Sequence, residues 1–202
     1  MTKQTRKNTH YPQYHVLEQA EHWDPHTSEI VYDRIKYTYS PSFLAPSEVE
    51  LLKQICMHLI DDKNEEILDY IIRHIDETLS SNIGENQREV GIPPGQELMR
   101  EGLKFINSIT KQYNYMQFIE SNDNAQLAML EQLNKGKLSS NDWTIKLQKA
   151  LFKKILSLTV DAYYSHPLIW SEIGYGGPAY PRGYVRTEIG NLDPWEAQPK
   201  RK

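Results

Sequence analysis

The segment EEILDYIIRHIDETL (residues 65–79) carries isoleucine and leucine at intervals of three and four residues. In an α-helix such intervals place side chains on one face, whereas a half-buried strand requires strict alternation. The segment therefore predicts an amphipathic helix that buries one face in a core. That face consists of Ile67, Ile71, Ile72, Ile75 and Leu79.

Helical patterns continue on both sides of this segment. Before it, Ser47 and Glu50 match the S-x-x-E pattern of a capping box, and apolar residues at helical spacing follow as far as Leu59. After it, residues 81–95 are rich in glycine and proline, which predicts a loop. Three further helices are predicted at about residues 96–113, 124–134 and 141–164. No segment alternates with period two, so we expect an all-α fold of about five helices, packed as an orthogonal or bundle-like domain.

The apolar series of these helices mark their buried faces. In the helix at 124–134, Leu127, Leu130 and Leu133 lie three residues apart and are expected to face the core, and Gly136 is expected to end the helix. The faces are aliphatic, and no inward E-x-x-H pairs accompany them, which argues against a di-metal centre between helices.

Proline and glycine divide the chain into three segments. Residues 1–39 form a polar N-terminal arm with a short helix, and residues 40–164 form the helical domain. Residues 165–202 alternate aromatic residues with glycine and proline, which predicts an irregular C-terminal extension. Three prolines are expected to exclude regular helix from this extension: Pro167, Pro178 and Pro181.

The short helix of the arm has a clear start. Asp24 is a good N-cap and Pro25 suits the first helical position, so a helix is expected from Pro25 to about Lys36. Because this helix begins between His22 and His26, the two histidines do not lie one turn apart on one face, and we expect no metal site. The histidines of the arm are His10, His15, His22 and His26.

Cys56 is the only cysteine of the chain, so it cannot form an internal disulfide. It lies within an apolar helical series, which favours a buried thiol that packs like a small hydrophobic residue. A nucleophilic role would require an environment that lowers the thiol pKa.

The composition excludes several classes of function. The 202 residues include 39% hydrophobic residues, with a mean hydropathy of −0.67 and a net charge of −4. This charge does not fit the broad basic surface of a nucleic-acid-binding protein. No run approaches the ~18 apolar residues of a membrane span, and residues 1–15 lack the apolar core and paired arginines of an export signal. We therefore expect a cytoplasmic protein that reaches a membrane only through a partner.

The C-terminal extension carries the most specific functional signal. It has too many prolines and glycines to be ordered by its own backbone hydrogen bonds, so its aromatic residues must pack against a surface. Tryptophan, tyrosine and arginine also dominate the energetics of protein interfaces. We expect these side chains to dock onto a partner, with Trp170 packing in part on the chain's own helices. The docking candidates are Trp170, Tyr175, Tyr180, Arg182 and Tyr184, together with Trp23 from the arm.

A longer pattern resembles a known family. Its C-terminal part comprises Tyr163-Tyr164-Ser165-His166-Pro167, then Trp170, then Gly174-Tyr175-x-Gly177-Pro178-Ala179 and Gly183-Tyr184. Its N-terminal part comprises Phe43-Leu44 with Glu48, Leu59-Ile60-Asp61 and Asp69-Tyr70-Ile71. Over about residues 40–190 the chain resembles the gluconate 2-dehydrogenase subunit 3 family. The stretch from Trp23-x-Pro25-x-Thr27 to Arg34 resembles an extension found in some members.

The resemblance implies a non-catalytic accessory (gamma) subunit of a membrane-associated, FAD-dependent gluconate or sugar dehydrogenase. It implies a large flavoprotein partner of the glucose-methanol-choline type, and often a cytochrome subunit. Small subunits of this family assist maturation, stability or export of the flavoprotein, many with a twin-arginine signal that this sequence lacks. We therefore expect a stabilising or maturing role. FAD is expected in the partner, because this chain has no dinucleotide-binding motif.

Two alternatives come from other functional classes. The first is a binding or scaffold module, such as a dedicated chaperone, that is unrelated to redox chemistry. The second is an enzyme in its own right, for which Asp161, His166 and Glu172 are the only grouped candidates. We assign no catalytic, cofactor-binding or metal-binding residue to this chain.

Overall fold

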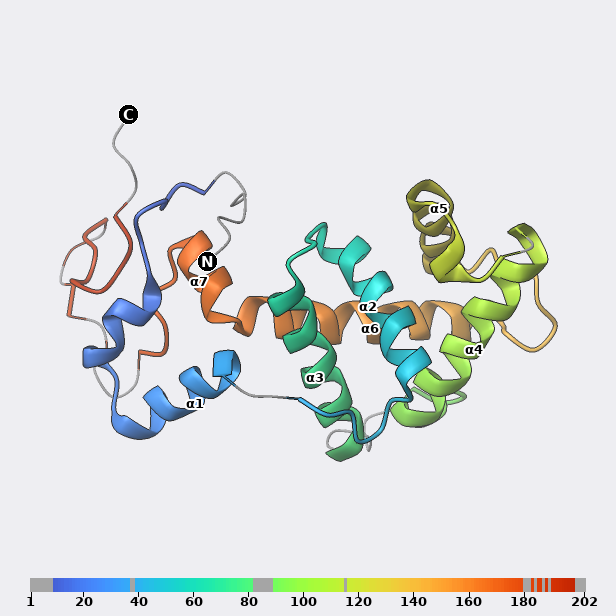
Figure 1. The fold of residues 1–202 in the computed structure, drawn as a ribbon, viewed down its shortest axis with the longest axis horizontal. Coiled ribbons are helices and arrows are strands. Elements are labelled where there is room, and N and C mark those ends of the chain that lie inside the picture. Colours follow the sequence, from blue (N-terminus) through green and yellow to red (C-terminus); the bar gives the residue numbers. More distant parts are fainter. Residues whose placement is uncertain are drawn as a thin grey trace. The chain divides into compact units, whose positions relative to one another are not determined.

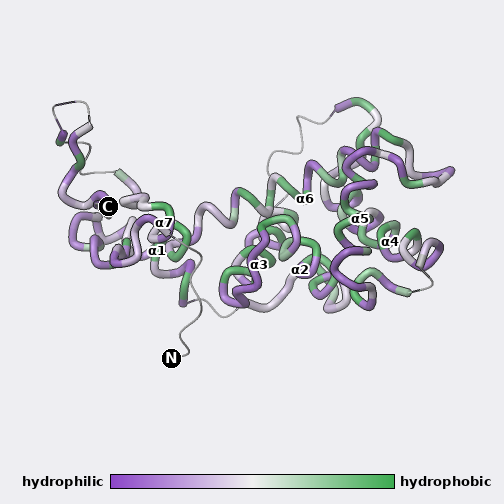
Figure 2. The backbone as a smooth tube through the Cα atoms, turned by 90° about the horizontal axis from the view of Figure 1, so that it is seen from above, coloured by the Kyte–Doolittle hydropathy of each residue, from purple (hydrophilic) through white to green (hydrophobic). Residues whose placement is uncertain are grey.

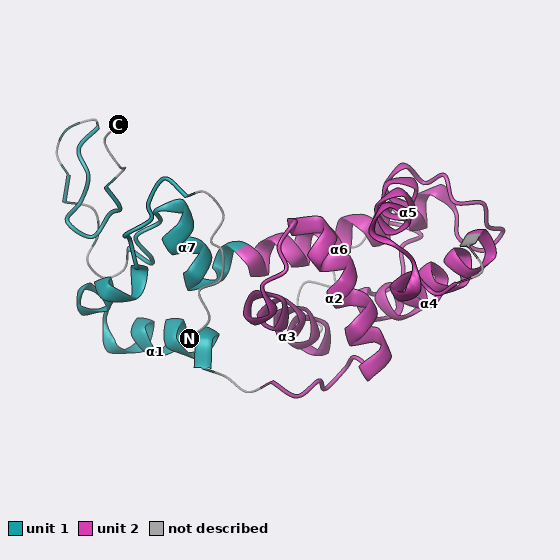
Figure 3. Ribbon diagram, turned by 45° about the horizontal axis from the view of Figure 1, so that its top comes forward, with its two compact units in different colours: residues 1–38, 164–202 teal, residues 39–163 magenta. Residues whose placement is uncertain are grey.

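The computed structural model describes residues 9–36, 39–81, 89–114, 116–179, 183, 185–186, 188 and 190–198. All regular secondary structure in these residues is helical, which confirms the predicted all-α fold. The chain divides into two compact units, coloured separately in Figure 3. Both ends of the chain belong to the same unit, although the sequence predicts an arm and an extension as separate segments. Unit 1 joins Met1–Thr38 with Tyr164–Lys202, and unit 2 is Tyr39–Tyr163.

Unit 2 contains the five helices that apolar spacing predicts (Figure 1). Within it, α2 contacts α3, α4 and α5. None of the helices in the described ranges is long and apolar enough to cross a bilayer. The elements are α2 (Pro46–Ile60), α3 (Glu65–Ser81), α4 (Gly95–Asn114), the 3-10 helix η3 (Phe118–Glu120), α5 (Asp123–Lys135) and α6 (Ile145–Ser165), whose last two residues belong to unit 1.

The core of unit 2 lies between α2, α3, α4 and α6. All five residues predicted for the inner face of α3 are buried, as the spacing in residues 65–79 requires. Gly102 lets α4 approach α6 closely, because a Cβ atom at this position would lie 2.3 Å from a methyl carbon of Leu151. Along α6, hydrophilic and hydrophobic residues alternate in Figure 2, as expected for a helix with one buried face.

The predicted inner face of α5 is wrong at one position. Leu127 is 47% exposed, whereas the neighbouring Gln126 is buried. Gln126 Oε1 accepts a hydrogen bond from Gln54 Nε2 at 3.0 Å, and its Nε2 donates to the carbonyl groups of Phe118 at 2.8 Å and Ser121 at 2.9 Å. Because these bonds replace those to water, the amide is buried at little cost and holds the loop before α5 against α2.

The predicted capping box at Ser47 and Glu50 is also wrong. The helix α2 begins one residue earlier, at Pro46, with Ala45 as its N-cap. Glu48 is then the third helical residue, and its carboxylate accepts the Ala45 N–H at 2.8 Å. Proline is favoured at the first helical position, so Pro46 sets the start of the helix.

A buried carboxylate orders the chain in front of α2. Asp76, on α3, accepts the backbone N–H groups of Ser42 at 2.8 Å, Phe43 at 3.0 Å and Leu44 at 2.7 Å. Burial alone would raise the pKa of Asp76, but these N–H groups and the Ser42 hydroxyl together hold that pKa below its usual value. The charged form is therefore part of the native structure of unit 2.

Unit 1 is built from segments at the two ends of the chain. The N-terminal segment, predicted as a polar arm, supplies three of the four residues in a buried cluster with Trp170: Val16, Trp23 and Val31. The predicted exclusion of helix by Pro167 is wrong, because Pro167 occupies the first position of a helix. At that position a backbone N–H would have no partner within the helix, so proline is tolerated there. The elements of unit 1 are η1 (Val16–His22), α1 (Pro25–Lys36) and α7 (Pro167–Ile173).

Candidate functional site

In the C-terminal extension, the first complete helix is α7, and a specific residue caps each of its ends. His166 is the N-cap, and its Nδ1 accepts the Leu168 N–H at 3.2 Å. At the other end Gly174 has φ of +76°, a left-handed conformation that glycine adopts without a steric penalty. The end predicted for the last long helix, at about residue 164, is confirmed, because α6 ends at Ser165, directly before His166-Pro167.

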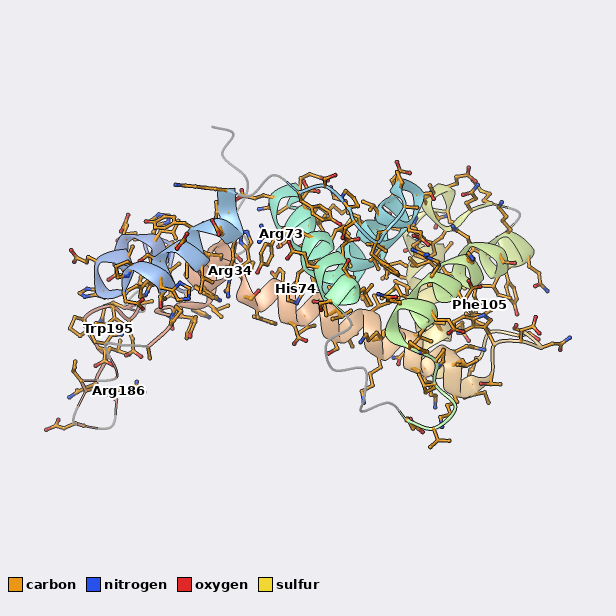
Figure 4. The ribbon with its side chains drawn as sticks, turned by 90° about the horizontal axis from the view of Figure 1, so that it is seen from below. Arg34, Arg73, His74, Phe105, Arg186 and Trp195 are labelled. Atoms are coloured by element: carbon orange, nitrogen blue, oxygen red, sulfur yellow. The ribbon has the colours of Figure 1, made fainter. Side chains whose placement is uncertain are left out.

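Trp170 is a core residue of unit 1. Its side chain is only 5% exposed, and its Nε1 donates to the Tyr164 carbonyl at 2.6 Å. The Arg34 guanidinium lies 5.2 Å from the centre of the Trp170 ring and donates to the Ser165 carbonyl at 2.7 Å. Arg34 is labelled in Figure 4. This arrangement combines a cation–π contact with a charged donor at the C-terminal end of α6.

His166 lies in the same core, with no exposed surface. Burial, and next to it the charge of Arg34, lower the pKa of His166 to about 4. The ring is therefore neutral at neutral pH. Because Nδ1 accepts a hydrogen bond, the proton of the neutral ring resides on Nε2. A histidine without exposed surface cannot contact a substrate from this position, so His166 does not suit the catalytic role considered for it beside Asp161 and Glu172.

Trp23 is also buried, at 6% exposure, so it offers little surface to a partner. The chain turns past its ring at Gly177, where a Cβ atom would lie 2.6 Å from a ring carbon of Trp23. The ring of Tyr11 lies equally close to Gly174, again at 2.6 Å from a Cβ atom built there. Two aromatic residues of the N-terminal segment thus pack on the glycines that follow α7.

Tyr175 is the exposed docking candidate among the residues that the structure describes. It is 43% exposed, and its ring packs edge-on against Trp170 with 5.3 Å between the ring centres. Ile173, at the end of α7, is 49% exposed. Ile173 ends α7 and Tyr175 follows the C-cap Gly174, so two exposed, partly apolar side chains lie close together in the sequence at this end of the helix. The other predicted candidates Tyr180, Arg182 and Tyr184 lie outside the described residues.

The end of the extension contains an ordered turn that sequence reasoning missed. Asp193 accepts the N–H groups of Val185 at 2.9 Å and Arg186 at 2.7 Å. The carbonyl of Trp195 accepts the Tyr14 hydroxyl at 2.7 Å, and the Trp195 ring is buried. The signal was present as Asp193-Pro194-Trp195-Glu196, in which Glu196 accepts the Asp193 N–H as in a capping box.

Each of two open clefts includes a polar side chain that is already engaged. The cleft of about 580 Å³ beside the start of α6 includes Gln148, whose amide binds both the N–H and the carbonyl of Leu138. The cleft of about 370 Å³ in unit 1 includes Glu196, which pairs with Arg186. In the described ranges, no three histidine, cysteine or carboxylate side chains gather as metal ligands would.

Cys56 is buried, as predicted. Its Sγ lies 3.3 Å from the Thr159 hydroxyl, and burial raises the thiol pKa to about 12. The thiol therefore lacks the thiolate character that a nucleophile needs.

We expect native Cys56 to resist thiol-specific reagents at pH 8, because both its pKa and its burial suppress the reactive thiolate. Absorbance-monitored reaction with a disulfide reagent should show labelling only after unfolding in denaturant. Rapid reaction of one thiol in the folded protein would contradict a buried, structural role.

Comparison with known proteins identifies one related family. The family model described as gluconate 2-dehydrogenase subunit 3 matches residues 46–177. The match begins at the first residue of α2 and ends at Gly177, so it includes α7 and Tyr175 but leaves out η1 and α1. We found no match among curated proteins and none among solved structures.

Proposed function

Because the chain belongs to the gluconate 2-dehydrogenase subunit 3 family, we propose that it is a non-catalytic accessory subunit that stabilises or matures an FAD-dependent dehydrogenase. Membership makes it a subunit of a dehydrogenase complex. The partner we propose is a large flavoprotein of the glucose-methanol-choline type that oxidises gluconate or a related sugar, with a cytochrome subunit as electron acceptor. FAD would be held by the flavoprotein. A cytoplasmic location, at the membrane periphery through the partner, stays a prediction.

The observation that carries the proposal is the family match over residues 46–177, which includes α7 and Tyr175. The burial and the shifted pKa values of two titratable side chains support the non-catalytic role. His166 is buried with its pKa lowered to about 4, and Cys56 is buried with its pKa raised to about 12. A catalytic acid, base or nucleophile needs access to the substrate and a pKa matched to its task.

The surface that we propose for docking is the exposed end of α7, with Ile173 and Tyr175. Tyrosine is frequent among interface hot spots, since it buries a large rigid ring at a low cost in conformational entropy. The edge-on contact with Trp170 holds the Tyr175 ring in place before binding, which reduces that cost further.

We expect Tyr175→Ala to weaken binding of the flavoprotein about tenfold or more, because it truncates the exposed aromatic anchor. The dehydrogenase would be co-expressed with the tagged subunit, and the affinity measured by titration of the purified proteins. The isolated subunit should show no flavin absorbance.

A matched control is Tyr113→Ala, which truncates a tyrosine of similar exposure, 52%, on α4 of unit 2. Equal binding by the wild type and both variants would move the interface away from α7. Failure of the flavoprotein to bind even the wild-type subunit would favour the scaffold or chaperone alternative.

A further inference from the structure

A second surface of α7 is filled by the chain itself. We use the name platform for α7 together with residues 174–177, and the name strap for residues 9–36. The strap lays the ring of Tyr11 on Gly174 and the ring of Trp23 on Gly177. At either glycine a Cβ atom would lie 2.6 Å from the aromatic ring, so the ring can pack here only because the residue is glycine.

Polar contacts fix the strap in one register. The Val16 N–H donates to the Ser171 hydroxyl at 3.0 Å, and the Thr9 hydroxyl donates to the Glu172 carbonyl. Both acceptors belong to α7. The platform thus combines hydrogen-bond acceptors with glycines on which aromatic rings pack. These features suit the binding of a chain segment that carries aromatic residues.

The platform and the strap differ in their relation to the family. The family match, residues 46–177, contains all of the platform and none of the strap. The apolar surface of α7 therefore lies within the matched region, whereas its cover lies outside it. Without the strap, Trp170 would lose the three buried neighbours Val16, Trp23 and Val31 and would form part of an exposed apolar patch. Such patches mark sites of protein association.

One buried strap residue, Trp23, leaves a hydrogen-bond donor unsatisfied. The Trp23 side chain is only 6% exposed, yet its Nε1 has no hydrogen-bond partner among the described residues. A buried donor without an acceptor costs free energy, and tryptophan normally meets this need when it is buried. A segment that placed an aromatic ring at Gly177 and also satisfied its polar edge would compete favourably with the strap.

We propose that the strap occupies in cis a docking platform for an aromatic-bearing segment of the flavoprotein, which displaces the strap when the complex forms. The inference rests on the proposed function, since it names the second contact with the same partner. Tyr175 and Ile173 remain exposed while the strap is bound, so they provide the first contact. The strap keeps the platform covered in the free subunit and prevents association through its apolar surface.

The proposal predicts that weakening the strap strengthens partner binding. Trp23→Ala removes the ring at Gly177 without changing any residue of the platform, and the affinity for the flavoprotein should rise about tenfold or more. Ile30→Ala is the matched control, because it lies in the strap but is 44% exposed. Its affinity should equal that of the wild type. Circular dichroism of each variant establishes that the helices are retained.

A second measurement does not depend on a substitution. A protease site is inserted between Lys36 and Ser42 of the full chain, and the cut protein is examined by gel filtration and by fluorescence anisotropy. The strap should stay bound after cleavage and exchange with a labelled synthetic peptide of residues 9–36. Added flavoprotein should then release the labelled peptide. A peptide with the Trp23→Ala change should bind about thirtyfold more weakly.

The outcomes separate the two proposals. If the flavoprotein binds no form of the subunit, the proposed function fails. Equal affinity of the flavoprotein for the intact protein, the Trp23→Ala variant and the cut protein would refute displacement of the strap. Binding of the flavoprotein to the cut protein without release of the labelled peptide would refute it as well. In both cases the accessory role stands. Loss of the helices on cleavage would show that the strap is integral core, and would also refute displacement.

Discussion

Trp170→Ala is expected to destabilise unit 1 by about 3–5 kcal/mol, the usual cost of removing a large aromatic residue from a core. The indole is 5% exposed and packs with Val16, Trp23 and Val31. Truncation leaves a cavity between them and removes the hydrogen bond to the Tyr164 carbonyl. It also removes the ring over which the Arg34 guanidinium lies, so a charged group loses its apolar cover.

The measurement is denaturant unfolding followed by tryptophan fluorescence. Three of the four tryptophans, at positions 23, 170 and 195, belong to unit 1, so this signal reports mainly on that unit. Trp170→Phe keeps most of the apolar volume and should cost clearly less than the alanine variant. Tyr175→Ala should cost below about 1 kcal/mol, since its ring is partly exposed. Equal stability of Trp170→Ala and the wild type would show that Trp170 is not part of a packed core.

Unit 1 is also expected to lose about 3 kcal/mol of stability between pH 7 and pH 4 through His166 alone. The pKa of His166 is lowered to about 4 in the folded protein, below its ordinary value of 6.5. Between these values the unfolded chain binds more protons than the folded chain, so acid favours unfolding. The contribution is fully present above pH 6.5 and is lost as the pH falls toward 4.

His166→Asn separates this effect from the titration of carboxylates. The asparagine side chain can accept the Leu168 N–H as an N-cap, as His166 Nδ1 does, but it does not titrate. Unfolding free energies of both proteins would be measured at several pH values from 7 to 4. The stability of the wild type relative to the variant should fall by about 3 kcal/mol over this range. A constant difference would mean that His166 is not buried in its neutral form.

Residues 65–79 show how far local spacing determines the fold. Apolar residues three and four apart can share a face only in a helix, so the helix and its buried side follow from neighbours along the chain. The observed helix α3, Glu65–Ser81, agrees with this prediction. The same holds for α1, where Asp24 accepts the His26 and Thr27 N–H groups and Pro25 starts the helix. Caps and starts of this kind need no distant partner.

Positions that local patterns assigned wrongly or did not single out depend on partners that are far away in the sequence. Gln126 replaces Leu127 on the inner face of α5 because Gln54, 72 residues earlier, supplies part of its hydrogen bonding. Asp76 is buried because three N–H groups more than 30 residues away converge on it. A hydrophobic pattern assigns polar residues to the surface, and only a completed hydrogen-bond network reverses that assignment.

For the candidate site too, some features follow from the sequence and others from the tertiary structure alone. The aromatic, glycine and proline residues of the extension, and the family to which they point, were evident from residue types and their order. Which aromatic residues are buried was decided only by tertiary structure, because Trp23 and Trp170 are 147 positions apart and bury each other only when the two ends of the chain meet in unit 1. Burial is a property of surfaces in contact, and residue types specify how strongly a side chain avoids water but not which surface will cover it. For that reason residue type alone did not show that Tyr175 is exposed while its neighbour Trp170 is buried.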